Sequence, residues 1–275
     1  MPELPETETI ARDLDRAVSG ATIASVKVYR ADVLRDTTAA ALSRRVAGTR
    51  IERSYRRAKA VVILLDTNDR IVVQPRFTGA LLVDDGTLPA NALTYITVSL
   101  RLEDGRTLAY RDVRRLGTLT LMSPARYAKF EAALGPEPLD PEFTPQHLSG
   151  ILRDSRQAVK KLLMDQRRVA GVGNIYANEA LWRARIDPSR AARTITGEEA
   201  ASLHSGLTGV LREAIAARGT SFRDYRDASG ARGGFSELLS AYGRGGLPCP
   251  RCGATLIDTS AIDGRTTVFC AWCQQ

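Results

Sequence analysis

Hydrophobic positions near the start of the chain repeat at helical spacing. Ile10, Leu14 and Val18 fall on one face of a segment that opens with Pro5, carries glutamates in its first turn and is followed by Gly20. Proline in the first turn and glycine after the last periodic residue are typical helix boundaries. The pattern predicts an amphipathic helix over residues 5–18.

Short β-type runs separated by Gly, Asp and Pro follow this helix. They cover Thr22–Val28, Ala60–Leu65, Arg70–Gln74, Gly79–Val83, Tyr95–Leu102, Thr107–Arg111 and Gly117–Leu121. Many short strands with such punctuation predict an antiparallel sandwich or barrel.

The second half of the chain has helical periodicity. Prolines limit regular structure from residue 124 to about residue 149, which predicts a connecting segment. Predicted helices then cover Leu148–Met164 and Tyr176–Ala184. A third begins at the capping-box pattern Thr196-x-x-Glu199 and ends at Gly219.

All four cysteines lie near the C-terminal end. Cys249 and Cys252 form one C-x2-C pair, Cys270 and Cys273 form another, and 17 residues separate the pairs. Four thiolates at this spacing suit a structural zinc ion in a closed tetrahedral site. Two disulfides are the alternative, but no signal peptide is recognisable, which favours a reducing compartment and zinc.

Two β-type runs, 254–260 and 266–269, lie between the cysteine pairs. Asp263-Gly264 between them is a hairpin turn signal, and Arg265 follows at once. Arg265 is therefore predicted at the hairpin tip, either solvated or in contact with a phosphate.

The first six residues, Met-Pro-Glu-Leu-Pro-Glu, suggest chemistry at the N-terminus. Removal of Met1 would leave Pro2 as a secondary amine, and an α-amino group with a pKa near ~8 is partly neutral and nucleophilic at physiological pH. Glu3 and Glu6 are within reach as proton-transfer groups. A Pro-Glu pair also opens many ordinary helices.

Taken together, these motifs resemble the bacterial formamidopyrimidine-DNA glycosylases, the family that includes endonuclease VIII. The resemblance runs from Met1 to the last cysteine pair. It rests on Pro2–Glu6, Arg56–Lys59, Arg114-Arg115 before Gly117, Gly135–Pro138, Gly171–Ala177 and the four-cysteine hairpin.

The resemblance implies an α+β protein of several parts. We expect an N-terminal helix with an antiparallel β-sandwich as the catalytic domain over residues 1–123 and a linker over 124–150. A helix–two-turn–helix DNA-binding domain with a lesion-capping loop is expected over 151–244, and a zinc finger over 245–275.

It also implies a bifunctional enzyme of base excision repair. Pro2 would form a Schiff base at the sugar C1′, with Glu3 as the proton-transfer partner, and β,δ-elimination would follow. Glu6 is assigned either to positioning Pro2 and assisting at the sugar or to a first-turn helix acid. One structural zinc ion is expected, with no catalytic metal or organic cofactor.

The DNA contacts are assigned from the same resemblance. Lys59, which is also counted among the catalytic residues, would lie in the cleft near the lesion and contact phosphates. Lys160 would contact the backbone, although Lys161 makes the register ambiguous. Asn174 would cap the helix after the glycine-rich turn and help bind phosphate, and Arg265 would bind phosphate from the hairpin tip.

Phe77, Arg114 and Leu116 would fill the gap left by the flipped nucleotide. Here the sequence departs from the family pattern: Gln74–Phe77 replaces a common His-Leu-x-Met, and Leu116 replaces a common phenylalanine. The segment from Arg218 to Phe235 resembles the capping loop of the purine-specific enzymes. This favours 8-oxoguanine and formamidopyrimidines.

Charge agrees with a DNA partner. Lys and Arg number 39 against 31 Asp and Glu, a formal net charge of +8, which suits a polyanion. We expect a monomeric cytoplasmic protein bound to damaged double-stranded DNA, with no membrane segment. The alternatives are an endonuclease VIII-like enzyme for oxidised pyrimidines, a non-catalytic damage-binding protein, and a zinc-ribbon RNA-binding protein.

Overall fold

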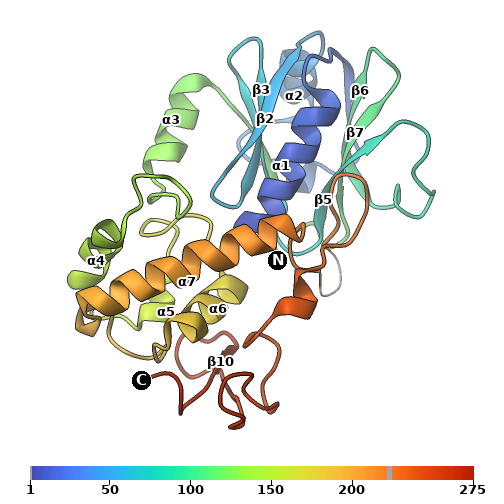
Figure 1. Cartoon of the computed structure of the whole chain (residues 1–275). Coiled ribbons are helices and arrows are strands. Elements are labelled where there is room, and N and C mark those ends of the chain that lie inside the picture. Colours follow the sequence, from blue (N-terminus) through green and yellow to red (C-terminus); the bar gives the residue numbers. More distant parts are fainter. Residues whose placement is uncertain (1, 222–224) are drawn as a thin grey trace. The chain divides into compact units, whose positions relative to one another are not determined.

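The computed structural model describes residues 2–221 and 225–275 (Figure 1). The chain divides into two compact units. The first comprises Met1–Ala132 and Ala217–Ser236, and the second comprises Ala133–Ala216 and Glu237–Gln275. The segment 217–236, which the sequence analysis assigned to the DNA-binding domain, therefore groups with the N-terminal unit.

The predicted N-terminal helix is present as α1, Leu4–Val18. Glu3 is its N-cap and forms a capping box with Glu6, which satisfies backbone amides that the first turn leaves without helical partners. The buried face of α1 includes Ile10, Leu14 and Val18, as the periodicity predicts.

Eight strands of the first unit form two four-stranded antiparallel sheets. The first has the order β1-β6-β7-β5 and the second β2-β3-β4-β8. Their bounds are β1 Ile23–Val28, β2 Ile51–Arg57, β3 Ala60–Leu65, β4 Arg70–Gln74, β5 Gly79–Asp84, β6 Ile96–Leu102, β7 Thr107–Asp112 and β8 Thr118–Met122. The sandwich alternative is therefore confirmed over the barrel.

Strand β3 is buried along its whole length because both of its faces are covered. Val61, Ile63 and Leu65 belong to the core shared with α1, whereas Ala60 and Val62 pack with Tyr127 of α3, Pro124–Ala132. Burial on both faces explains the continuous apolar run.

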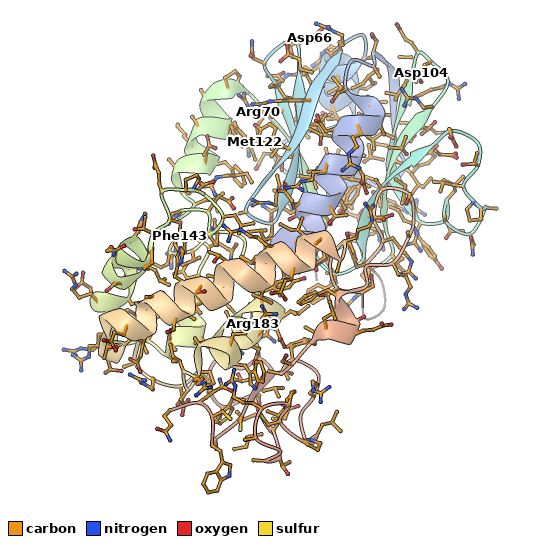
Figure 2. The ribbon with its side chains drawn as sticks, in the orientation of Figure 1. Asp66, Arg70, Asp104, Met122, Phe143 and Arg183 are labelled. Carbon is orange, nitrogen blue, oxygen red and sulfur yellow. The ribbon has the colours of Figure 1, made fainter. Side chains whose placement is uncertain are left out.

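Arg70 lies on the outer side of this second sheet. Arg70 and Met122, both labelled in Figure 2, pair across β4 and β8, and the Arg70 guanidinium lies 4.6 Å from the Tyr127 ring centroid.

Several elements of the first unit were not predicted. They are η1 Ala31–Val33, α2 Ala39–Val46, β2 and α3. Strand β2 reads as polar because it is an edge strand with most of its side chains partly or fully exposed. Helix α3 begins at Pro124, inside the predicted connection, since proline is tolerated in the first turn of a helix.

The second unit is mainly helical. Its helices are α4 Pro145–Arg153, α5 Val159–Leu163, α6 Asn174–Ala184, η2 Ala192–Thr194 and α7 Gly197–Ala216, and η3 Phe235–Leu238 follows across the boundary between the units. The capping box at Thr196 is confirmed: Thr196 N donates to Glu199 Oε2 at 2.8 Å, and Glu199 N donates to Thr196 Oγ1 at 3.2 Å.

The single helix predicted over Leu148–Met164 is wrong. Helix α4 ends at Arg153 and α5 starts at Val159 because the intervening backbone pairs with residues 190–193. Arg193 N donates to Ser155 O and Val159 N donates to Arg190 O. These tertiary hydrogen bonds replace helical ones.

No helix among the described residues is long and apolar enough to cross a membrane.

Candidate active site and nucleic-acid interface

The start of α1 is tied to the 217–236 segment through Glu6. Glu6 Oε2 accepts the Glu3 amide at 2.8 Å, and Glu6 Oε1 accepts the Thr220 amide at 2.7 Å. Pro2, Glu3 and Glu6 are all buried. One carboxylate therefore fixes the backbone next to Pro2 and the first turn of the predicted capping loop.

Glycine is required where this loop begins. Gly219 has φ +86, and an added Cβ would lie 2.9 Å from Glu6 Cγ. Residues 222–224 of the predicted loop lie outside the described residues.

Lys59 lies in the turn between β2 and β3, directly before β3 as predicted. This turn packs on the first turns of α1: Thr7 Oγ1 contacts Ala58 O at 3.5 Å, and Arg56 Nε donates to Glu8 Oε2 at 2.8 Å. The half-buried Lys59 is thus brought beside the helix that follows Pro2.

The three predicted wedge residues lie on two neighbouring loops of the first unit. Phe77 follows β4, whereas Arg114 and Leu116 precede β8. Phe77 and Leu116 have large apolar side chains that are 46% and 42% exposed. The Arg114 guanidinium lies 5.4 Å from the Phe77 ring centroid. The structure therefore places Phe77 beside Arg114 and leaves Leu116 exposed on the same loop as Arg114.

Asp112 braces the two loops, a role that the sequence analysis missed. Its buried carboxylate accepts from Thr78 Oγ1 at 2.5 Å and from Gly117 N at 2.8 Å, and Thr78 Oγ1 in turn accepts from Arg114 N at 2.9 Å. The only signal was its place at the start of the motif before Gly117.

Four cysteines converge in the second unit. Their Sγ atoms all lie within 4.8 Å of one another, and a tetrahedral zinc ion with Zn–S bonds of about 2.3 Å needs sulfurs about 3.8 Å apart. None of the four forms a disulfide in the described chain. Cys249, Cys252, Cys270 and Cys273 therefore form a structural zinc site, as predicted.

The predicted hairpin is present as β9, Ile257–Thr259, and β10, Thr267–Phe269. Gly264 takes φ +76 in the turn, and the exposed Arg265 follows it.

Lys160 has an environment that the sequence did not reveal. Its side chain is completely buried, and its ammonium donates to Thr267 Oγ1 at 2.7 Å and Thr266 O at 3.1 Å, with Asp263 Oδ2 at 3.3 Å. A burial of this degree presents no charge to solvent. A direct phosphate contact by Lys160 stays a prediction, and the observed contacts hold the hairpin tip.

Asn174 does not cap α6 as predicted. The N-cap is Gly173, and Asn174 is the first helical residue. Its side-chain amide instead donates to Thr266 O at 2.9 Å, and Asn178 Oδ1 accepts from Val268 N at 2.7 Å. Lys160, Asn174 and Asn178 together fix the strand that follows Arg265.

Three family descriptions match consecutive parts of the chain. Residues 1–119 match the formamidopyrimidine-DNA glycosylase N-terminal domain, residues 134–226 its H2TH domain, and residues 246–275 the zinc finger found in FPG and IleRS.

Similar proteins cover the whole chain. Formamidopyrimidine-DNA glycosylases of Roseiflexus sp. and Chloroflexus aggregans are 40% and 41% identical to it over 100% of this chain and 100% and 98% of theirs. The crystal structure of MutM (Fpg) from Thermus thermophilus has a TM-score of 0.87 and 38% identity, covering 99% of this chain and 98% of that one.

A Lactococcus lactis Fpg bound to DNA containing N7-benzyl-Fapy-dG has a TM-score of 0.90 and 30% identity over 100% of both chains. Motifs, fold, cysteine cluster and these likenesses agree along the full sequence. The chain therefore belongs to the formamidopyrimidine-DNA glycosylase family and is a DNA glycosylase of base excision repair with the family's AP lyase activity.

Proposed function

We propose that the protein removes oxidised purines, such as 8-oxoguanine and formamidopyrimidines, from double-stranded DNA, with the Pro2 amine as nucleophile. The observation that carries this proposal is the Glu6 carboxylate, which binds the Glu3 amide at 2.8 Å and the Thr220 amide at 2.7 Å. It joins the backbone next to Pro2 to the segment that would cover a flipped base.

The reaction begins once Met1 has been removed. The Pro2 nitrogen bonds to C1′, the C1′–base bond breaks, and the base leaves with a proton. Opening of the C1′–O4′ bond yields an iminium, with Glu3 as the proton-transfer partner at the sugar oxygen. The iminium acidifies the C2′ proton, and β- and then δ-elimination expel the 3′ and 5′ phosphates.

The remaining site residues bind the DNA or support its binding. Phe77, Arg114 and Leu116 occupy the gap in the duplex, which matches the exposure of the two apolar side chains. Lys59 binds a phosphate through the compact charge of its ammonium. Arg265 binds a phosphate through its planar, forked guanidinium. Lys160 and Asn174 support phosphate binding indirectly, because they hold the hairpin tip that carries Arg265.

The solved relatives support oxidised purines as the lesion class and also point to oxidised pyrimidines as an alternative. Lactococcus lactis Fpg has been crystallised with Fapy-dG DNA and also with DNA containing an oxidised pyrimidine. An endonuclease VIII-like preference for oxidised pyrimidines is therefore the second candidate. We further propose that the enzyme acts as a monomer in the cytoplasm, which sedimentation and cell fractionation would test.

Borohydride trapping tests the nucleophile and the lesion together. Duplexes carrying 8-oxoguanine opposite cytosine or thymine glycol opposite adenine are incubated with the wild type, Pro2→Gly and the control Pro5→Ala. We expect an adduct on 8-oxoguanine with the wild type and Pro5→Ala but not with Pro2→Gly, and mass spectrometry should show removal of Met1. Trapping on thymine glycol alone would establish the pyrimidine alternative, whereas binding without any adduct would favour a non-catalytic damage-binding protein.

A further inference from the structure

A buried carboxylate organises the second half of the 217–236 segment. Asp227 is 0% exposed, and its Oδ1 accepts from Ser229 N, Ser229 Oγ and Ala231 N at 3.0, 2.7 and 2.8 Å. Its Oδ2 accepts from Arg218 Nε at 3.0 Å and Nη2 at 2.5 Å. Burial acts to raise the pKa of Asp227, but the bonds from Arg218, Ser229 and Ala231 together hold it below its usual value.

Arg218 connects this turn to α1. Its Nη2 also donates to Asp13 Oδ2 at 2.5 Å, and its backbone takes φ 61, an uncommon conformation for a residue with a side chain. The guanidinium therefore joins the two carboxylates, one on α1 and one in the turn. We call Asp13, Arg218 and Asp227 the loop anchor.

Two of the contacts between helix α1 and the described part of the segment come from one face of the helix. Glu6 and Asp13 are seven residues apart, two helical turns, so their side chains project in nearly the same direction. Glu6 binds the Thr220 amide, and Asp13 binds the Arg218 side chain. The helix that begins beside Pro2 thus positions the segment directly.

Strand β5 supplies the opposite support. Val83 N donates to Ala228 O at 3.2 Å, and Ala228 and Tyr225 belong to the sandwich core. Figure 1 shows the orange segment after α7 running beside β5. The turn at Asp227 is therefore fixed against both α1 and the first sheet.

We propose that the loop anchor is a positioning device for base recognition: Asp13, Arg218 and Asp227 set the register in which the Thr220 amide meets the Glu6 carboxylate at 2.7 Å and the Tyr225 hydroxyl meets Glu6 O at 3.4 Å. This inference rests on the proposed function, because it assumes that the segment meets a flipped base. An abasic site has no base to recognise. The anchor should therefore matter for base excision and not for cleavage of an abasic strand that is already formed.

Two reactions of the same protein separate positioning from folding. Single-turnover excision of 8-oxoguanine and strand cleavage at a pre-formed abasic site are measured for the wild type, Asp227→Asn and Asp13→Asn. Arg218→Lys is included because an ammonium keeps the charge but lacks the planar fork that bridges two carboxylates. Asp13 lies on the surface of α1, where a substitution disturbs folding less. Asp13→Asn therefore keeps the test valid should Asp227→Asn fail to fold.

The matched control is Arg16→Gln. Arg16 is also on α1, and its side chain is 71% exposed and approaches Asp13 Oδ1 only to 3.7 Å. The substitution removes one positive charge close to the anchor without removing a bond to the segment.

We expect excision to slow about tenfold in Asp227→Asn and Asp13→Asn. Abasic-site cleavage should stay within about twofold of the wild type, since no base is contacted. Amide exchange in peptides covering 217–221 and 225–236 should accelerate in both variants but not in Arg16→Gln.

The proposal would be overturned if the variants lost base excision and abasic-site cleavage equally. It would also be overturned if excision stayed unchanged while amide exchange accelerated, or if amide exchange stayed unchanged. Failure of the proposed function would be visible separately, as absence of 8-oxoguanine excision by the wild type. In that case the same comparison is made on thymine glycol.

Discussion

The Nζ atom of Lys160 lies 2.7 Å from Oγ1 of Thr267, at the base of the zinc hairpin tip. A lysine is almost never fully buried without partners, and here Thr266 O and Asp263 also lie beside its ammonium. The contact links α5 to β10 within the second unit and places Arg265 two residues from a fixed point.

Loss of the Lys160 ammonium should destabilise the protein. Lys160→Met leaves Asp263, whose side chain is 3% exposed, without its cation, and breaking a buried pair in this way typically costs about 3 kcal/mol. We expect a lower unfolding midpoint in denaturant and a nearly unchanged salt dependence of DNA binding. The neighbouring Lys161, which is exposed, provides the control Lys161→Met. A normal midpoint with a salt slope reduced by about 1 would instead assign Lys160 to a phosphate.

Zinc removal should be visible in tryptophan fluorescence. The chain has two tryptophans: Trp182 packs against the cysteine cluster, and Trp272 lies between two ligands and is 79% exposed. We expect a chelator to shift the emission to the red as Trp182 is released, and DNA affinity to fall with it, since structural zinc sites depend on the metal for folding. Trp272→Phe should retain the shift, whereas Trp182→Phe should abolish it. The opposite pattern would contradict this assignment.

Phe77 and Leu116 should act after the DNA has been bound. Phe77→Ala should slow lesion excision about tenfold, because stacking of a base on an aromatic side chain is typically worth ~1–3 kcal/mol. Leu116→Ala should slow excision as well, because it removes an apolar wedge. Val113→Ala, a truncation at a 40% exposed position on the same loop as Leu116, is the control. The effect is measured as excision rates with each of the four bases opposite the lesion. If Phe77→Ala and Leu116→Ala excise the lesion as fast as Val113→Ala, Phe77 and Leu116 do not contact the DNA.

The α7 cap gives a prediction for pH dependence. Arg190 bonds foremost, with the Thr196 amide, hold the pKa of Glu199 below its usual value despite partial burial. A lowered folded-state pKa stabilises the protein above the unfolded pKa of about 4.3, and this stabilisation disappears as pH falls through the folded pKa. Glu199→Gln should cost about 1 kcal/mol at pH 7, and the difference from the wild type should be smaller at pH 3. Denaturant melts at both pH values test it, and a difference independent of pH would exclude the charge as the cause.

Local pattern determined most elements of this protein. The periodicity of Ile10, Leu14 and Val18 predicts α1, the apolar run Ala60–Leu65 predicts β3, and Thr196 with Glu199 predicts the start of α7. The cysteine spacing predicts the zinc site. The helix and strand signals lie within a few residues of the structure they specify. The cysteine pattern is specific because four thiolates at this spacing have few uses other than zinc binding.

Tertiary contacts decided the rest. The break between α4 and α5 depends on pairing with residues 190–193, and the role of Asn174 depends on the carbonyl of Thr266. The bond from Lys160 to Thr267 and the bond from Thr220 to Glu6 each join residues more than 100 positions apart. Sequence alone gives the charge of such a side chain but not its partner, because the partner is supplied by the folding of distant segments.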